Sequence, residues 1–468
     1  DPTVDLHTSG ISMLIDPISA LPYDKNGLAR VPVTNMGCYH DFEPEDNDAK
    51  MVQIVSPGSS VSIGVSTPIT VKIMNFGVNN LDSVTFNWIV NGGALNTMKY
   101  DCDLAFGVTS PAITLGSFIP ISGLNTLLVY TTNPNGVPDE NTSDDTLTYS
   151  VYACDSMLNG IYTIDSGGDF ASLDVAFMAL KNCGVNGPVE LRMATGTYSG
   201  LTIDTEFPGR SSTRTITITS ATGNAADVIF NADYSNALVL NGAKDLKFEK
   251  VSFGNTTNSL TGVTFINTNT NIEFYECNIY ASLSNTSNSC AAVYYNNTSG
   301  STNTLKDVRF IKNTIDGGYS NFWFNYPAGG SSNMSNMSVT IDSNIMKNSY
   351  YYALYAYYYG SYPSISYNTI TSRNSGLITS TWYGLHFYYY NNVEKIEGNR
   401  IISTNTNIMY PYGMYIYYYF NSPSYYGSGS SLIANNEIIL YTISSYYGIY
   451  LYNPYSNVEL LHNSIYMY

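Results

Sequence analysis

The chain has 468 residues, of which 12% are charged and 14% are aromatic, and its formal net charge is −17. Acids dominate the front, since residues 1–150 hold 16 acids and 5 bases, whereas residues 350–468 hold 4 acids and 3 bases. This balance excludes a nucleic-acid-binding protein, which needs a basic stripe. No apolar run approaches the length of about 20 residues that a membrane-spanning helix requires.

The front of the chain has the pattern of a small all-β domain. Residues 51–153 contain strand-like runs such as ITVKIMNFG, VTFNWIVNG and TLLVYTT, separated by turn-forming residues. The sequence therefore predicts a β-sandwich over 51–153, with Trp88 as a core anchor. For residues 1–50 the sequence allows two alternatives: they add strands to this sandwich, or they form a separate small lobe.

Two acidic segments of this region are candidate Ca²⁺ ligands, because calcium prefers oxygen donors and clustered carboxylates supply them. They are DFEPEDNDA at 41–49 and PDENTSDD at 138–145. The candidate ligands in the second segment are Asp139, Glu140, Asp144 and Asp145. The alternative is that both segments are solvated acidic loops.

The cysteines give a weaker pattern. The six are Cys38, Cys102, Cys154, Cys183, Cys277 and Cys290. No CxxC spacing is present, which argues against zinc. An even number allows disulfides in an exported protein, and Cys277 with Cys290 closes the shortest loop. Buried free thiols are the alternative.

Residues 154–185 are expected to be a linker followed by one helix. The segment FASLDVAFMALKNCG at 170–184 places Leu173, Phe177 and Leu180 on one face and ends at Gly184. A helix before a stacked array of strands is the expected cap of its open end.

From residue 186 to 468 two short phrases recur at uneven spacing. One phrase, Asn followed within two residues by Ile, appears as CNI at 277–279 and again as NTI, NIM, NRI, NEI and NSI. The other is YALYAYYY at 352–359 with the related YGLHFYYY, YGMYIYYY and YGIYLYNP. Both alternate with period two, so they predict strands, and recurrence at loosely fixed length predicts a solenoid.

We therefore predict a right-handed parallel β-helix over 186–468. In such a stack, side-chain amides at one position hydrogen-bond from turn to turn. The predicted ladder consists of Asn278, Asn313, Asn344, Asn368, Asn399, Asn436 and Asn463.

The tyrosines need a separate interpretation, because 29 of the 44 lie from Tyr350 onward. Runs of three consecutive tyrosines must expose at least one ring each, and stacked turns would align them. The predicted aromatic stripe consists of Tyr358, Tyr388, Tyr389, Tyr417 and Tyr418. Either the stripe is cross-strand packing, or it is a binding surface, because exposed aromatic area of this size marks a contact site.

The two ends of the chain also allow predictions. A chain that begins Asp-Pro-Thr without Met looks already processed, which suggests export. It ends directly after a repeat, and because solenoids need capped ends, we expect the β-helix to continue beyond Tyr468.

The block from GIYTIDSGGDF to ELRMATGTYSG, followed by RTITITSATGNAADVIF, resembles the opening of secreted parallel β-helix proteins of Bacteroidota. The phrase ITVKIMNFGVNNLDSVTFNWIVNG at 69–92 is similar to the adhesion-type immunoglobulin-like domain that precedes it in those proteins. The resemblance implies a large surface protein exported by the type IX route, such as a gliding-motility adhesin. It also implies O-glycosylation at Asp-Ser/Thr-apolar triplets, here at Ser83, Thr146 and Ser156.

An enzyme is the competing hypothesis, because pectin lyases and polygalacturonases share the β-helix scaffold and fold alone does not decide function. Glycoside hydrolysis uses a pair of carboxylates, yet acids are few after residue 300, and we assign no catalytic residue. Glu394, Lys395 and Glu397 form a small charged patch that reads as an exposed ion pair. We therefore predict a non-enzymatic extracellular adhesin or fibre component that binds glycans, surfaces or other copies of itself. The alternative is a polysaccharide lyase or hydrolase.

Overall fold

The computed structural model describes residues 14–15, 34–35, 45–58, 61–297, 303–326, 338–403, 405–418, 430–442, 444–454 and 457–468. The chain divides into two compact units, residues 1–156 and residues 157–468. Strands dominate both units, and α1 (Leu173–Cys183) is the single α-helix among the described residues. The predicted all-β class is therefore confirmed.

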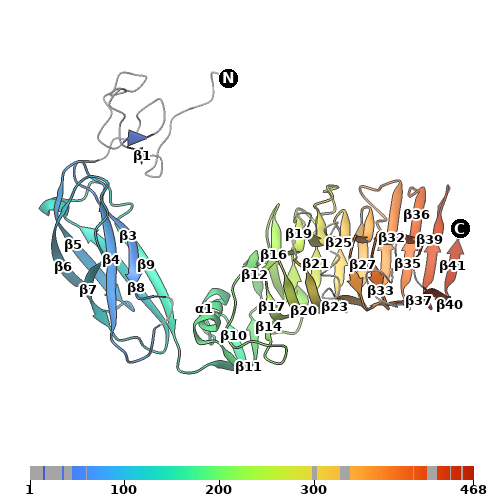
Figure 1. Cartoon of the computed structure of the whole chain (residues 1–468), viewed down its shortest axis with the longest axis horizontal. Coiled ribbons are helices and arrows are strands. Elements are labelled where there is room, and N and C mark those ends of the chain that lie inside the picture. The colour runs from blue at the N-terminus through green and yellow to red at the C-terminus, as the bar shows by residue number, and fades with distance from the viewer. Residues whose placement is uncertain are drawn as a thin grey trace, which may run out of the picture. The chain divides into compact units, whose positions relative to one another are not determined.

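The N-terminal unit contains two antiparallel sheets, of strand orders β3-β4-β7 and β6-β5-β8-β9 (Figure 1). Their bounds are β3 (Ala49–Ser56), β4 (Thr67–Asn75), β5 (Leu81–Val90), β6 (Asn96–Leu104), β7 (Ile113–Phe118), β8 (Gly123–Thr132) and β9 (Thr146–Ala153). A separate antiparallel pair is formed by β1 (Leu14–Ile15) and β2 (Thr34–Asn35), and a short 3-10 helix, η2 (Pro134–Gly136), follows β8. Buried side chains of both larger sheets, including Val71, Trp88 and Val129, form one hydrophobic cluster. Trp88 is thus part of the core, as the sequence predicted.

The helix α1 connects β10 (Leu158–Ile164) to β11 (Val185–Met193) and packs on both strands. It begins after Ser172, whose side chain accepts a hydrogen bond from the Val175 N–H, the N-cap arrangement that Ser favours. Leu173 and Leu180 are buried as predicted, whereas Phe177 is half-buried. The apolar face of the helix therefore includes small residues that the sequence pattern had not singled out, Ala176 and Ala179.

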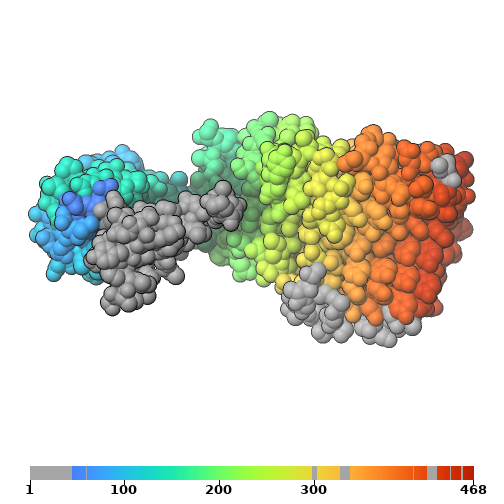
Figure 2. Space-filling view, turned by 90° about the horizontal axis from the view of Figure 1, so that it is seen from above, coloured from blue at the N-terminus to red at the C-terminus, as the bar shows by residue number. Residues whose placement is uncertain are grey.

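The unit of residues 157–468 contains three parallel sheets, which the chain visits in a fixed order. We name them the first, second and third sheets, with eleven, ten and nine strands, and we name one passage through all three a circuit. Each new circuit adds one strand beside the previous strand of each sheet. Figure 1 shows these strands side by side from β10 to β41, and Figure 2 shows successive circuits as consecutive bands of colour.

The first sheet consists of β10, β11, β14 (Ile216–Ser220), β17 (Lys244–Glu249), β20 (Asn269–Tyr275), β23 (Leu305–Ile311), β26 (Val339–Asp342), β30 (Ile365–Ser366), β34 (Lys395–Glu397), β37 (Ser430–Ala434) and β40 (Asn457–Leu461). The second consists of β12 (Gly196–Ser199), β15 (Val228–Asn231), β18 (Ser252–Phe253), β21 (Asn278–Tyr280), β24 (Thr314–Asp316), β27 (Ile345–Ser349), β31 (Thr369–Ser372), β35 (Arg400–Ser403), β38 (Glu437–Leu440) and β41 (Ser464–Met467). The third consists of β13 (Leu201–Ile203), β16 (Asn236–Asn241), β19 (Thr261–Ile266), β22 (Ala291–Asn296), β25 (Ser320–Asn325), β28 (Tyr352–Tyr357), β32 (Thr381–Tyr388), β36 (Tyr410–Tyr417) and β39 (Tyr447–Tyr452). A two-stranded sheet pairs β29 (Ser361–Tyr362) with β33 (Asn392–Val393), and a 3-10 helix, η3 (Ala225–Asp227), precedes β15.

Equivalent residues of successive circuits stack directly on one another inside this unit. Phe248, Phe274 and Phe310 face one another in register on three first-sheet strands. Their rings are parallel within 15°, with centroids 5.0 Å apart at both steps, and all three are fully buried. This spacing follows from the distance of about 4.8 Å between paired strands, so like side chains stack on like.

The asparagines of the repeated phrase form an internal ladder. The Nδ2 of one Asn donates to the Oδ1 of the next over 2.9–3.0 Å at all five steps along the series Asn313, Asn344, Asn368, Asn399, Asn436 and Asn463. Each of these Nδ2 atoms also donates to a backbone carbonyl, as that of Asn368 does to Ile341 at 2.8 Å. The ladder thus satisfies polar groups where the chain leaves the first sheet, since a buried amide without partners would be costly.

Asn278 does not belong to this ladder, contrary to the sequence prediction. Its register partner is Thr314, and the ladder position of this circuit is held by Cys277, whose N–H donates to Asn313 Oδ1 at 2.8 Å. The two phrases align by their isoleucines, because Ile279 pairs with Ile315. The prediction aligned the asparagines instead and was displaced by one residue.

The predicted Cys277–Cys290 disulfide is also wrong. Both residues are buried free thiols, and burial raises the pKa of Cys277 to about 12. Cys277 contacts backbone carbonyls through its Sγ, at 3.3 Å from the oxygen of Phe248. The cysteines that are disulfide-bonded are Cys154 and Cys183. Cys38 lies outside the described residues.

The ladder should be a main source of stability for this unit. Replacing Asn368 by Ala removes the acceptor of the Asn344 N–H and Nδ2 groups, and each buried polar group without a partner costs about 1–3 kcal/mol. We expect the free energy of unfolding to fall by about 3 kcal/mol, measured by urea denaturation of the full chain with far-UV circular dichroism.

Asn278→Ala is the matched control, because Asn278 makes a single side-chain bond, to Ser252 Oγ at 3.2 Å, outside the ladder. Its loss should stay below about 1 kcal/mol. Equal losses for the two variants would contradict the structural role given to the ladder.

Candidate functional site

The outer side of the third sheet carries aligned aromatic side chains in three rows. We name these three rows, together with the line of Tyr358, Tyr389 and Tyr418 that lies against the third row, the tyrosine face. The first row is Tyr352, Tyr383, Tyr412 and Tyr447. The second is Trp323, Tyr355, His386, Tyr415 and Tyr450. The third is Tyr357, Tyr388, Tyr417 and Tyr452.

The rings within each row stack on one another. In the third row the centroids of Tyr357 and Tyr388 are 5.4 Å apart, and the next two steps are 4.9 Å each, all within 9° of parallel. In the second row the Trp323–Tyr355 step is 4.2 Å and the Tyr415–Tyr450 step is 4.8 Å. Because each ring covers part of its neighbour, most of these side chains are half-buried although they point outward.

The glycine of the Tyr-Gly phrase explains how the strands fit beneath this face. A Cβ added at Gly413 would lie 2.5 Å from the Gly448 oxygen and 2.6 Å from Ile438 Cγ2, which is too close for any side chain. Gly384 and Gly448 are equally confined. In each Tyr-Gly pair the tyrosine therefore points outward, and the residue after it must be glycine because an isoleucine of the second sheet occupies the space of a side chain.

His386 is the one titratable residue of the three rows that is not a tyrosine. Its ring stacks between those of Tyr355 and Tyr415 at centroid distances of 5.4 and 5.0 Å, and it is 6% exposed. Burial lowers its pKa to about 3, so the imidazole is neutral at physiological pH. The tyrosine face is therefore uncharged.

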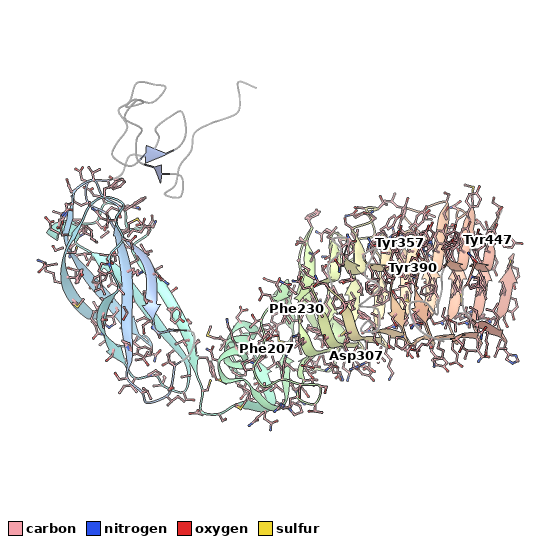
Figure 3. All side chains as sticks on the ribbon, in the orientation of Figure 1. Phe207, Phe230, Asp307, Tyr357, Tyr390 and Tyr447 are labelled. Atoms are coloured by element: carbon pink, nitrogen blue, oxygen red, sulfur yellow. The ribbon has the colours of Figure 1, made fainter. Side chains whose placement is uncertain are left out.

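The aromatic stripe predicted from the sequence is divided between the third row and a line of tyrosines beside it. Tyr388 and Tyr417 belong to the third row, whereas Tyr358, Tyr389 and Tyr418 form an adjacent line at the turn that follows each strand. The Tyr358 and Tyr389 rings stack at 5.3 Å, and those of Tyr389 and Tyr418 meet edge to face at 5.7 Å. Figure 3 shows Tyr357, Tyr390 and Tyr447 along one side of the unit and Asp307 at the opposite edge.

The tyrosines of this adjacent line have a left-handed backbone, with φ of 56°, 53° and 63°. In the next circuit the equivalent position, following Tyr452, holds Asn453 with φ 49°. Asn suits this conformation better than a bulky residue does. Three successive circuits thus each have a tyrosine at a position whose backbone does not favour a bulky residue.

A cavity of about 510 Å³ opens on the second sheet, lined by Asn231, Asn255, Tyr280, Asp316 and neighbouring small residues. Asp316 is the sole carboxylate among the described residues that line it. Its oxygens are engaged by Lys347 Nζ at 3.3 Å and by Asn348 Nδ2 at 2.8 Å. This cavity thus lacks the carboxylate pair of a glycosidase, whereas a second cavity, of about 560 Å³ beside α1, is lined by Asp165 and Asp174. In the patch predicted elsewhere, Lys395 and Glu397 form an ion pair at 3.3 Å and Glu394 is exposed.

The acidic segments of the N-terminal unit meet in space. Oxygens of Asp48, Asp144 and Asp145 lie within 4.8 Å of one another. Burial, and then the neighbouring Asp144, raises the pKa of Asp48 to about 7; burial, and then Asp139, raises that of Asp145 to about 7. Of the other predicted ligands, Asp139 accepts a hydrogen bond from the Ala49 N–H at 3.0 Å, and Glu140 accepts one from the Asn47 N–H at 2.9 Å.

The three predicted glycosylation positions lie in the N-terminal unit. Ser83 is half-buried in β5, Thr146 is exposed at the start of β9, and Ser156 is exposed in a bend. No helix in the described parts of the chain combines the length and apolar character needed to cross a membrane.

No protein-family model and no curated protein matches this chain. Among solved structures it is similar to the CARDB domain of the PF1109 protein from Pyrococcus furiosus, known from a crystal structure in complex with di-metal ions and from a solution NMR structure. Both comparisons give 18% identity and a TM-score of 0.19, and they cover 24% of this chain and 96% and 97% of those chains. Values this low assign neither a fold nor a function.

The sequence prediction missed most of the tyrosine face. It named the ends of the Tyr runs but not the first row, nor Trp323 and His386 in the second row. The available signal was the Tyr-Ala or Tyr-Gly start of the four phrases, which fixes their mutual alignment. Asp48 lay inside the first acidic segment but was not singled out as a ligand.

The tyrosine face should make the fold sensitive to alkali. An unfolded Tyr ionises with a pKa of about 10, whereas burial, followed by nearby tyrosines, raises the pKa of Tyr388 and Tyr415 to about 12. Between these values the unfolded chain releases protons that the folded chain keeps. The free energy of unfolding is therefore unaffected below about pH 10 and falls as the pH rises towards 12.

Ultraviolet absorbance of phenolate and circular dichroism, recorded on the same samples, measure this effect. We expect part of the tyrosines to ionise only as the strands unfold, and Tyr388→Phe to move the alkaline midpoint upward. Ionisation of all tyrosines near pH 10 with the fold retained would contradict this prediction.

Proposed function

We propose that this protein is a non-enzymatic extracellular adhesin that binds through its tyrosine face. The proposal takes residues 157–468 as a right-handed parallel β-helix and the N-terminal unit as an immunoglobulin-like β-sandwich. The parallel register of the three sheets and the antiparallel sheets of the first unit support these assignments. This is the combination expected of the secreted Bacteroidota surface proteins that the sequence resembles.

The observation that carries the proposal is the continuity of the tyrosine face. The first and third rows run through four successive circuits, β28, β32, β36 and β39, and all their members are tyrosines. Packing within one sheet does not need this, since a mixture of polar and branched residues covers an outer sheet face equally well. A large uninterrupted aromatic surface is the usual mark of a contact site.

The adjacent line of turn tyrosines supports the same conclusion. An aromatic residue with a left-handed backbone costs about 1–2 kcal/mol relative to an ordinary conformation. Tyr358, Tyr389 and Tyr418 carry this cost in three consecutive circuits, although Asn453 shows that a better-suited residue fits there. Tyr234 and Tyr367 have the same backbone outside the face, so it is the alignment of the three rings together with this cost that favours a functional role.

The chemistry of the face selects a neutral partner. Its phenolic groups stay protonated at physiological pH, because an ordinary tyrosine has a pKa of about 10 and burial raises the pKa of Tyr352, Tyr383 and Tyr388 still further. Protonated phenols both donate and accept hydrogen bonds, and the ring faces offer apolar contact with little loss of conformational entropy. Both properties suit an uncharged polysaccharide, whose sugar rings have apolar faces and hydroxyl edges.

Two further observations bear on location and on the enzyme alternative. Disulfide-bonded Cys154 and Cys183 support an oxidising, extracellular environment. For a polysaccharide lyase or hydrolase, the cavity of the second sheet offers Asp316 as its single carboxylate among the described residues, and the cavity beside α1 offers Asp165 and Asp174.

The triple variant Tyr358→Asn, Tyr389→Asn and Tyr418→Asn tests the adhesive role. Asn tolerates the left-handed backbone, so the fold should be kept while three rings are removed from the face. We expect adsorption of the purified full chain to microcrystalline cellulose or polystyrene to weaken at least about tenfold, as the loss of aromatic anchors does at other interfaces. Salt should change this binding little, since the face is uncharged.

The matched control is Tyr234→Asn with Tyr367→Asn. These residues have the same left-handed backbone, with φ of 56° and 57°, and are 82% and 59% exposed, but they lie outside the tyrosine face. Adsorption of the control should be unchanged. If the triple variant also adsorbs normally, the rings are surface packing only. If it instead loses a self-association seen by analytical ultracentrifugation, the face joins copies of this chain into a fibre.

A further inference from the structure

We infer that the N-terminal unit binds one calcium ion between Asp48, Asp144 and Asp145. These residues come from two segments far apart in sequence, the one that leads into β3 and the one that leads into β9. The oxygens that they offer all lie within 4.8 Å of one another. The site is separate from the tyrosine face and does not depend on the proposed adhesive function.

The cluster is buried, unlike ordinary acidic loops. Asp48 is 2% exposed and Asp145 is 4% exposed. Ionised carboxylates are almost never buried at this level without a paired charge or a metal ion, because the loss of hydration is large. Among the described residues, the one cation at the cluster is Lys50, whose Nζ lies 2.9 Å from Asp144 Oδ2. One ammonium group does not balance three carboxylates together with nearby Asp139.

Two buried oxygens have no partner within the described part of the chain. Asp48 Oδ1 and Asp144 Oδ1 accept no hydrogen bond from it, although the other oxygens of both residues do. Asp48 Oδ2 accepts from Asn141 Nδ2 at 3.2 Å, Asp144 Oδ2 is held by Lys50, and Asp145 Oδ1 accepts from Thr131 Oγ1 at 3.3 Å. The protein thus fixes one oxygen of each carboxylate, and the second oxygens of Asp48 and Asp144 are the ones that could coordinate an ion.

The donor set selects the ion. All three side chains offer oxygen, and the cluster contains neither His nor Cys. Oxygen donors in an irregular, partly backbone-fixed arrangement suit calcium, whereas zinc and copper prefer nitrogen or sulfur and magnesium demands a near-octahedral shell that usually includes several waters.

Neighbouring contacts hold the segments around the cluster in place. Asp139 Oδ2 accepts the Ala49 N–H at 3.0 Å, and the Met51 N–H donates to the Asp144 carbonyl at 3.1 Å. A bound ion would therefore join the segments before β3 and β9 and stabilise the unit.

Isothermal titration calorimetry and differential scanning calorimetry of the full chain test this, after chelator treatment and dialysis. We expect one CaCl₂ site per chain and, at saturating calcium, a rise of at least about 5 °C in one unfolding transition. Asp48→Asn and Asp145→Asn should each abolish both effects, while circular dichroism reports the fold. Removing one buried negative charge leaves the neighbouring carboxylates less repelled, so these variants should fold without calcium.

Asp101→Asn is the matched control, because Asp101 is an exposed acid of the same unit, paired with Lys99 at 3.4 Å. It should bind calcium as the unaltered chain does. Absence of binding heat and of any thermal shift would overturn the inference, as would normal binding by Asp48→Asn. Binding of MgCl₂ with no response to CaCl₂ would overturn the assignment to calcium.

Discussion

The parallel hydrogen bonding of each circuit to the next is the constraint on which the larger unit depends. Paired strands lie about 4.8 Å apart, and the register repeats without a shift through most of the third sheet, from β16 to β39. Each side chain must therefore lie above the side chain of the same position in the circuit before. A residue type is stable at such a position only if it stacks well on itself.

Three kinds of self-stacking residues meet this requirement in different places. Phenylalanine rings fill the interior at 5.0 Å spacing. Asparagine amides form the ladder where the chain leaves the first sheet, each one both donating and accepting. Tyrosine rings cover the outer side of the third sheet. The same geometry thus gives stability inside the unit and a regular, uncharged aromatic surface outside.

The two units use different physical chemistry. The larger unit has few charges in its later circuits and depends on stacking and on amide hydrogen bonds. The N-terminal unit collects the acidic residues, and part of this charge is buried around Asp48 and Asp145. That arrangement makes the stability of the first unit responsive to a cation, whereas the tyrosine face should be indifferent to salt. The proposed adhesion and the proposed ion response therefore belong to different units.

The sequence by itself determined the all-β class, the parallel stacking and the six asparagines from Asn313 to Asn463. It could do so because equivalent positions of successive circuits need similar residues, so the repeat of the fold is visible in the sequence as repeated phrases. The tertiary structure decided those contacts that the repeated phrases do not predict. It placed Cys277 rather than Asn278 in the ladder, because register follows the buried Ile279 and not the polar residue beside it. It left Cys277 and Cys290 as thiols, since a short loop does not bring two side chains together. It joined Asp48 to Asp144 and Asp145 and added Trp323 and His386 to the tyrosine face, because those neighbours are created only when distant segments pair.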